Sequence, residues 1–224
     1  VFKIHLGVPA VVSTFRPNWD APRPELAEAF RDLRVRKALS FAINREEINQ
    51  ILYHGLLEPA SYSFGPASQY YSKDAAQMYA EYAPDEARRL LDEAGYIDHD
   101  KDGIREFENG EAFRFTIDVI PGMGVDICQL AADHWREIGI AVDLNIALRD
   151  IVFPRWSSGE FDMWWWWAWS DDPVVDRGDW GMMGPNLPGW HRTAKKNGPA
   201  WLHDVTRLIE ESGTSVDTSL VNRN

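Results

Sequence analysis

The stretch that decides the fold is residues 113–148, which read FRFTIDVIPGMGVDICQLAADHWREIGIAVDLNIAL. Its first part alternates apolar and polar residues and predicts a strand whose buried face carries Phe113, Phe115, Ile117 and Val119. A turn at Gly122 and Gly124 leads to a predicted helix that ends at Gly139. The face of this helix that points to the core is predicted to carry Ile127, Leu130, Ala131, His134 and Ile138. The next strand alternates through Ile140, Val142, Leu144, Ile146 and Leu148. This order predicts a βαβ unit with a parallel strand pair, and therefore an α/β fold.

Helical patterns precede this unit. The apolar spacing predicts helices at residues 24–33, 36–42 and 45–54, and Asn44 with Glu47 three residues later forms a capping-box pattern before the third. Pro84 and Gly95 suit the first turn and the end of a fourth helix. Residues 56–82 show no clear period, so we expect an irregular segment there.

Three more segments follow the βαβ unit. We expect a short segment at 150–158, a third strand at 161–169 and a last helix at about 199–211. Residues 170–198 are rich in Asp, Gly, Pro and Trp and are expected to be mostly loop. No internal repeat is present, and we expect a single α/β lobe over residues 1–224.

Composition and charge exclude several classes of protein. The 224 residues include 23 basic and 35 acidic side chains, a formal net charge of −12, which argues against a nucleic-acid partner. The longest apolar run, residues 163–169, is far shorter than the roughly 20 residues needed to span a bilayer. Cys128 is the only cysteine, so no internal disulfide can form. The sequence has no zinc-type histidine spacing, no nucleophile elbow and no Walker A loop, and no catalytic residue is predicted.

One acidic stretch resembles part of a calcium loop. Asp98, Asp100 and Asp102 occupy positions 1, 3 and 5, Gly103 follows at position 6, and Glu106 at position 9 suits a water-mediated ligand. Position 12, which should carry a bidentate glutamate, is an asparagine. The three aspartates are therefore candidate ligands for a structural calcium ion, and the favoured alternative is a turn closed by its own side chains. No other cofactor is predicted.

Tryptophan is concentrated near the third predicted strand. Eight of the eleven tryptophans lie between residues 156 and 190. On a strand, residues 164 and 166 face one side, and residues 165, 167 and 169 face the other. The second face either lines a binding cleft for an amphiphilic ligand or is buried by a second layer, and the sequence leaves both interpretations open. Asp171 follows the strand directly, where strands of open α/β sheets usually meet their ligands.

The sequence also resembles a known family. Residues 30–49, FRDLRVRKALSFAINREEIN, closely resemble the segment that marks the family 5 extracellular solute-binding proteins, which serve ABC importers for peptides, nickel and some oligosaccharides. The resemblance continues through YHGL at 53–56, EPA at 58–60, APDEA at 83–87, LLDEAGY at 90–96, DKDGI at 100–104 and FDM at 161–163. It covers most of the chain and implies a type II periplasmic-binding-protein-like fold, with a mixed sheet flanked by helices.

The family resemblance carries expectations about domains and location. Family members are usually more than twice as long, so the resemblance implies a C-terminal lobe without the N-terminal lobe and without the C-terminal return segment. It also implies a monomer that delivers its ligand to ABC-transporter permease subunits, in the periplasm or outside the cell, with or without a lipid anchor.

The resemblance further implies a ligand site. In oligopeptide-binding members an Asp just after the tryptophan strand pairs with the peptide α-ammonium, and Asp171 matches that position. An Arg that contacts the ligand carboxylate in some members is replaced here by Trp165. We therefore expect the ligand-binding residues to be Asp171, Trp165, Trp167, Trp169 and Trp156. Oligopeptides are the favoured ligands, oligosaccharides stacked on the indoles are the alternative, and a glycan hydrolase is a weaker alternative.

Overall fold

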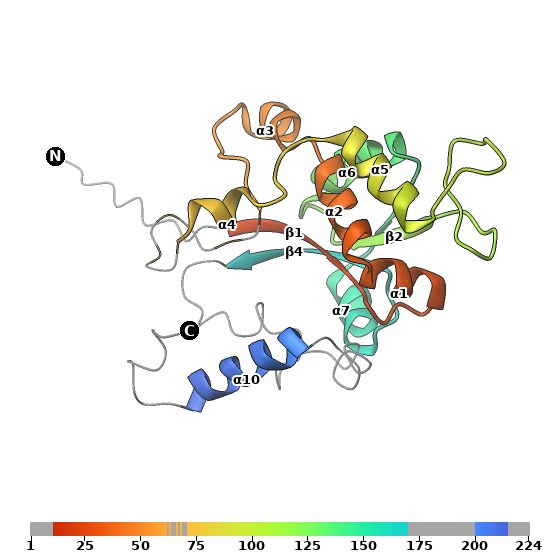
Figure 1. The fold of residues 1–224 in the computed structure, drawn as a ribbon. Coiled ribbons are helices and arrows are strands. Elements are labelled where there is room, and N and C mark those ends of the chain that lie inside the picture. Colours follow the sequence, from red (N-terminus) through yellow and green to blue (C-terminus); the bar gives the residue numbers. More distant parts are fainter. Residues whose placement is uncertain are drawn as a thin grey trace.

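A computed structural model describes residues 11–61, 63, 66, 68, 71–169 and 200–214 (Figure 1). In chain order the elements are β1 (Val11–Pro17), α1 (Pro24–Arg31), α2 (Leu33–Ala42), α3 (Arg45–Tyr53), α4 (Lys73–Gln77), α5 (Pro84–Ala94), β2 (Arg114–Val119), α6 (Val125–Glu137), β3 (Ala141–Ile146), α7 (Arg149–Ser158), β4 (Met163–Trp169) and α10 (Ala200–Thr214). Among these described residues, no helix is both long enough and apolar enough to cross a membrane.

The strands form one mixed sheet in the order β1-β4-β2-β3. β2 pairs in parallel with both β3 and β4, and β1 pairs antiparallel with β4. The predicted βαβ unit is confirmed as β2, α6 and β3, and the predicted α/β class with a mixed sheet is confirmed with it. The strand β1 was not predicted from the sequence.

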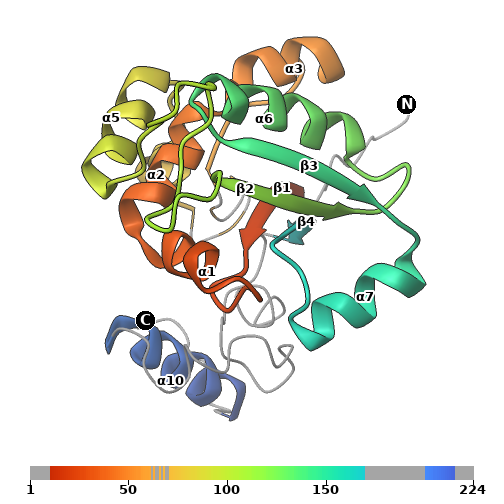
Figure 2. The same cartoon turned by 90° about the vertical axis from the view of Figure 1, so that its right-hand side faces the viewer.

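Helices cover both faces of the sheet (Figure 2). The main core joins α1, α2, α5 and α6 to one face, and its largest fully buried side chains include Trp135, Phe30 and Phe115. A smaller core lies under α7 on the other face and contains Ile120, Val152, Phe161 and Trp164. The sheet is therefore the middle layer of three.

Trp135 of α6 joins several elements of the main core. Its indole Nε1 donates to the carbonyl oxygen of Leu39 in α2 at 2.8 Å, within the buried interior. Its ring makes edge contacts with Phe15 of β1 and Phe115 of β2, with centroid distances of 5.0 and 5.5 Å. The sequence analysis did not place Trp135 on the inward stripe of this helix, although its side chain is only 1% exposed.

The start of α3 differs in one detail from the predicted capping box. The Asn44 side chain accepts the N–H of Glu47 at 3.1 Å, as predicted. The Glu47 carboxylate does not return to the Asn44 N–H but lies 3.0 Å from Nε2 of buried His134 in α6, while the Asn44 N–H donates to Nδ1 of His134 at 3.4 Å. His134 therefore joins the beginning of α3 to α6.

Three other segments differ from their predictions. Inside residues 56–82, expected to be irregular, Lys73–Gln77 form the short helix α4. Residues 150–158, expected as a short segment without an assigned structure, lie in the helix α7. The predicted inward face of the second strand of the βαβ unit ends early, because Ile146 and Leu148 are 51% and 66% exposed at the open edge of the sheet. The last helix is confirmed as α10, whose Leu202 is buried and whose Trp201 makes an edge contact with Trp19.

Candidate ligand-binding site

The topology creates a crevice at the carboxyl ends of β2 and β4. From β2 the chain passes through α6 to β3 on one side, then returns through α7 to β4 on the other side of β2. The two crossover helices lie on opposite faces of the sheet (Figure 2). In open α/β sheets, ligands bind where the strand order reverses in this way, outside the carboxyl ends of the strands.

A cavity with a volume of about 350 Å³ lies at this crevice and is called the smaller cavity below. Its lining combines the turn after β2 with two indoles of β4 and residues of β1 and α3, and includes Gly122, Met123, Gly124, Asp126, Trp165 and Trp167. Gly124 begins α6 with a φ of 74°, which favours glycine. A Cβ atom at this position would lie 2.3 Å from the Trp165 ring, so the glycine allows the indole to lie against the helix start.

The larger cavity has a volume of about 760 Å³ and lies between β1, β4, α2, α3 and the segment before α5. It shares Ser13, Tyr53, Ile127 and Trp167 with the smaller cavity, so the two cavities adjoin. Much of its lining is apolar and includes Phe15, Leu39, Ile43, Ile48, Trp135 and Met163. Between these apolar side chains lie the hydroxyl groups of Thr14 and Ser40 and the amide of Asn49. Such a cavity suits a ligand with apolar parts and a few hydrogen-bonding groups.

Two guanidinium groups line the larger cavity. Arg45 donates to the carbonyl oxygens of Ser40 and Ala80 at 2.9 and 3.1 Å, and burial lowers its pKa to about 10, so it remains a cation at neutral pH. Arg36 donates to the carbonyl oxygen of Phe30 at 2.9 Å, and burial lowers its pKa as well. Within the described part of the chain, no carboxylate lies within ion-pair distance of either guanidinium. The lining of this cavity is therefore locally positive.

The described tryptophans of the strand divide between the two faces. Trp165 is 3% exposed and lines the smaller cavity, and Trp167 is half-buried and lines both cavities. On the opposite face Trp164 is buried in the smaller core and stacks on Trp156 at a centroid distance of 5.1 Å. On the face of residues 165 and 167, Trp165 is buried in the main core and also lines a cavity, and the binding of an amphiphilic ligand there stays a prediction.

The other three predicted ligand residues are Trp156, Trp169 and Asp171. Trp156 lies on the α7 face and lines neither cavity, so its role as a ligand residue stays a prediction. The backbone of Trp169 pairs with Val11 at the carboxyl end of β4. Asp171 lies outside the described residues. The sequence analysis predicted a turn at Gly124 but did not predict that Gly124, Tyr53 or Ser13 lines a site, because only the folded chain brings β1, α3 and the start of α6 to β4.

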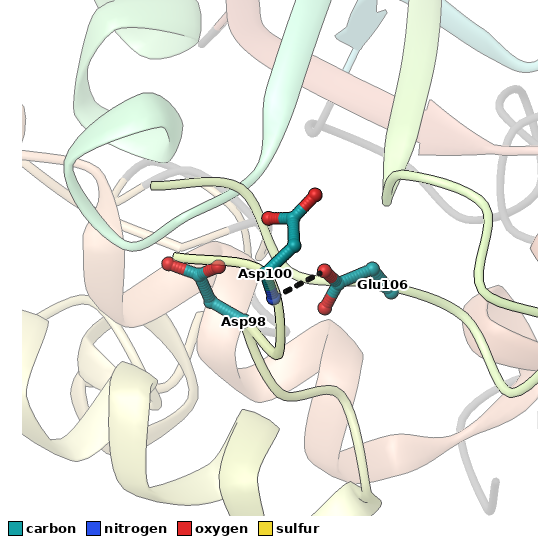
Figure 3. Close-up of side chains that lie close together, drawn as sticks. All are labelled: Asp98, Asp100 and Glu106. Atoms are coloured by element: carbon teal, nitrogen blue, oxygen red, sulfur yellow. Dashed lines mark hydrogen bonds between the residues drawn. The ribbon is translucent and has the colours of Figure 1, made fainter. Parts of the chain in front are cut away.

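The aspartate loop before β2 is closed by hydrogen bonds to its own backbone. The Asp98 carboxylate accepts the N–H groups of Lys101 and Gly103 at 2.7 and 3.1 Å. Glu106 accepts those of His99 and Asp100 at 2.9 and 3.4 Å, and Figure 3 draws the bond from Asp100. Carboxylate oxygens of Asp98, Asp100 and Glu106 lie within 4.8 Å of one another, and Asp102 is not part of this group. These hydrogen bonds are the ones expected if the turn is closed by its own side chains. Calcium binding stays a prediction.

Asp98→Ala is expected to lower the free energy of unfolding by about 2 kcal/mol, because two backbone donors lose their acceptor. Asp98→Asn is the matched control, since its amide keeps one acceptor oxygen and should cost less. Urea denaturation in EDTA measures both variants without a contribution from bound metal. Equal stability of Asp98→Ala and the wild type would contradict this account of the loop.

Comparison with known proteins agrees with the sequence motifs. Residues 4–186 match the profile of the bacterial extracellular solute-binding proteins, family 5, middle region. The oligopeptide-binding protein AppA of Bacillus subtilis is 32% identical over 148 residues, which are 63% of this chain and 27% of AppA. The aligned residues therefore span about a quarter of the length of this relative.

Solved structures agree on the fold. A structure of the oligopeptide-binding protein OppA has a TM-score of 0.85 and 30% identity, over 94% of this chain and 37% of that protein. AppA from Bacillus subtilis in complex with a nonapeptide has a TM-score of 0.71 and 24% identity, over 96% of this chain and 42% of AppA. A periplasmic oligopeptide-binding protein of Thermotoga maritima with bound mannohexaose has a TM-score of 0.71 and 23% identity, over 96% of this chain and 41% of that protein. The chain belongs to the family 5 bacterial extracellular solute-binding proteins.

Proposed function

We propose that this chain is part of the substrate-binding subunit of an ABC importer and captures oligopeptides outside the cytoplasm. The observation that carries the proposal is the cavity at the carboxyl ends of β2 and β4 together with the larger cavity that adjoins it, because Trp167 lines both. In this arrangement Trp165 and Trp167 contact the ligand, and Asp171 and Trp169, which follow along the same chain segment, complete the contact.

Peptides are favoured over oligosaccharides by the lining of the larger cavity. Its apolar side chains, among them Leu39, Ile43 and Met163, suit peptide side chains better than sugar hydroxyls. The indoles of Trp165 and Trp167 support oligosaccharides as the second candidate, because an indole face stacks well on the C–H face of a sugar. Both ligand types occur among the similar structures, in AppA with a nonapeptide and in the Thermotoga protein with mannohexaose.

We further propose that the chain forms one side of a two-lobed clamp. The relatives with similar structures are more than twice as long, which supports a second lobe that closes over the ligand. One lobe offers only half of the contacts, so the 224-residue chain should bind ligand more weakly than the full-length protein. The full-length protein would be a monomer in the periplasm or outside the cell, with or without a lipid anchor, and would pass its ligand to permease subunits.

Calorimetry on the full-length protein tests this function against dipeptides, longer peptides and cello- or xylo-oligosaccharides. We expect micromolar or tighter binding of a peptide, and we expect Trp167→Ala to weaken it at least about 30-fold, because a central aromatic contact is typically worth 2 kcal/mol or more. Trp156→Ala, on the other face of the sheet, tests the remaining sequence-based prediction. Failure of every peptide and oligosaccharide to bind would refute the proposal, and a larger loss in Trp156→Ala than in Trp167→Ala would move the site away from the cavities.

A further inference from the structure

We propose that the smaller cavity is a subsite for an organic cation of the ligand, held by the Asp126 carboxylate and the indoles of Trp165 and Trp167. The inference rests on the proposed function and specifies which chemical group of the ligand enters which cavity. It assigns the cation to a carboxylate in the first turn of α6, a different segment from the one that carries Asp171.

Three aromatic side chains line this cavity. Trp165 and Trp167 meet edge to face, with ring centroids 6.3 Å apart and an interplanar angle of 73°, and Tyr53 of α3 lines the same cavity. Trp165 lies deep in the wall and Trp167 is half-buried beside it. Aromatic faces at an angle attract ammonium and guanidinium groups through the negative potential above each ring.

Among the described residues that line this cavity, Asp126 is the one with a charged side chain. It is exposed, and among the described residues no hydrogen bond or ion pair engages its carboxylate. The start of α6 contributes a partial positive charge of about one half, which is smaller than the full negative charge of the carboxylate. The cavity therefore carries a net negative potential and favours a cation over an anion.

The larger cavity has the opposite charge. Arg36 and Arg45 line it, and Glu58 is the only carboxylate among its lining residues. The two arginines repel a cationic group of the ligand, and Asp126 attracts it. Tyr53 and Trp167, which line both cavities, lie between the two regions. The two cavities thus orient a ligand with a cationic group at the Asp126 end.

A peptide can supply such a cation from its N-terminal ammonium or from a basic side chain. Three probes on the full-length protein separate these sources: Ala-Lys-Ala, Ala-norleucine-Ala, and Ala-Lys-Ala with an acetylated N-terminus. If the side chain is the source, the lysine peptides bind more tightly than the norleucine peptide whether or not they are acetylated. If the terminus is the source, acetylation weakens binding and the norleucine peptide binds as well as the lysine peptide.

Asp126→Asn tests the subsite directly by calorimetry. We expect it to weaken binding of the preferred cationic probe about tenfold or more and to leave the probe without that cation unchanged. Asp133→Asn is the matched control, because it removes the same charge from an exposed position on α6 that lines neither cavity. An equal preference for the cationic probe in Asp126→Asn and the wild type overturns the inference but leaves the proposed function intact. Failure of all probes to bind the wild type overturns both.

Discussion

Gly124→Ala is expected to lower the free energy of unfolding by about 3 kcal/mol and to weaken ligand binding. Two costs add at this position. The backbone has a φ of 74°, which disfavours any residue with a Cβ atom. The new methyl group would also lie 2.3 Å from the indole of Trp165, so the ring must move from the wall of the smaller cavity. Urea denaturation and calorimetry measure the two effects.

Gly122→Ala separates these two costs. Gly122 has nearly the same φ, 76°, lies in the same turn and lines the same cavity, but nothing lies within 4 Å of an added Cβ atom. It should therefore cost only the conformational term, about 1 kcal/mol. If Gly122→Ala and Gly124→Ala were equally destabilised, the contact between Gly124 and Trp165 would have no energetic role.

Trp135→Ala is expected to lower the free energy of unfolding by about 4 kcal/mol, because it leaves a cavity in the main core and removes a buried hydrogen bond. Trp135→Phe keeps most of the ring but leaves the Leu39 carbonyl oxygen without its donor, and should cost about 2 kcal/mol.

Trp164→Phe is the matched comparison for the hydrogen bond. Trp164 is as deeply buried as Trp135, at 1% exposure, but its Nε1 has no hydrogen-bond partner among the described residues. Its replacement by phenylalanine should cost about 1 kcal/mol, mainly through lost contact area. Urea denaturation of both phenylalanine variants gives the comparison, and a smaller cost in Trp135→Phe than in Trp164→Phe would contradict the role of the Leu39 bond.

Much of the fold follows from local patterns in the sequence. The alternation in residues 113–119 and the glycines at 124 and 139 predicted the βαβ unit, because strand and helix periods differ clearly there. Asn44, Pro84 and Gly95 marked helix ends because each satisfies a local requirement of the backbone. These features depend on neighbours within a few residues, and they were predicted correctly.

The missed elements have no clear apolar pattern of their own. β1 is a strand because it pairs with β4, more than 140 residues later, and its own sequence has no strong alternation. α7 contains Pro154 and has no single apolar face, so its period was not visible. The overlooked Trp135 lies one residue after the predicted inward position His134, and both side chains are buried because α6 packs against α2 and α3 as well as the sheet.

The candidate site was predicted only in part for the same reason. The tryptophan strand was recognised from composition, and Trp165 and Trp167 do line cavities. The partners of these indoles come from β1, α3 and the start of α6, and no sequence pattern links those segments to β4. Asp126 in particular appears in the sequence as an ordinary acidic residue in the first turn of a helix.

The position of β4 between β1 and β2 has a consequence for folding during synthesis. Among the described strands β1 emerges from the ribosome first, and β4, its partner in the sheet, is the last of the four to emerge. β2 and β3 can pair before then, but until residues 163–169 have been made β1 has no partner strand, and the part of the main core that Met163 and Trp165 fill stays open to water. The sheet is therefore completed late, which is the slow behaviour expected of a topology with long-range strand pairing.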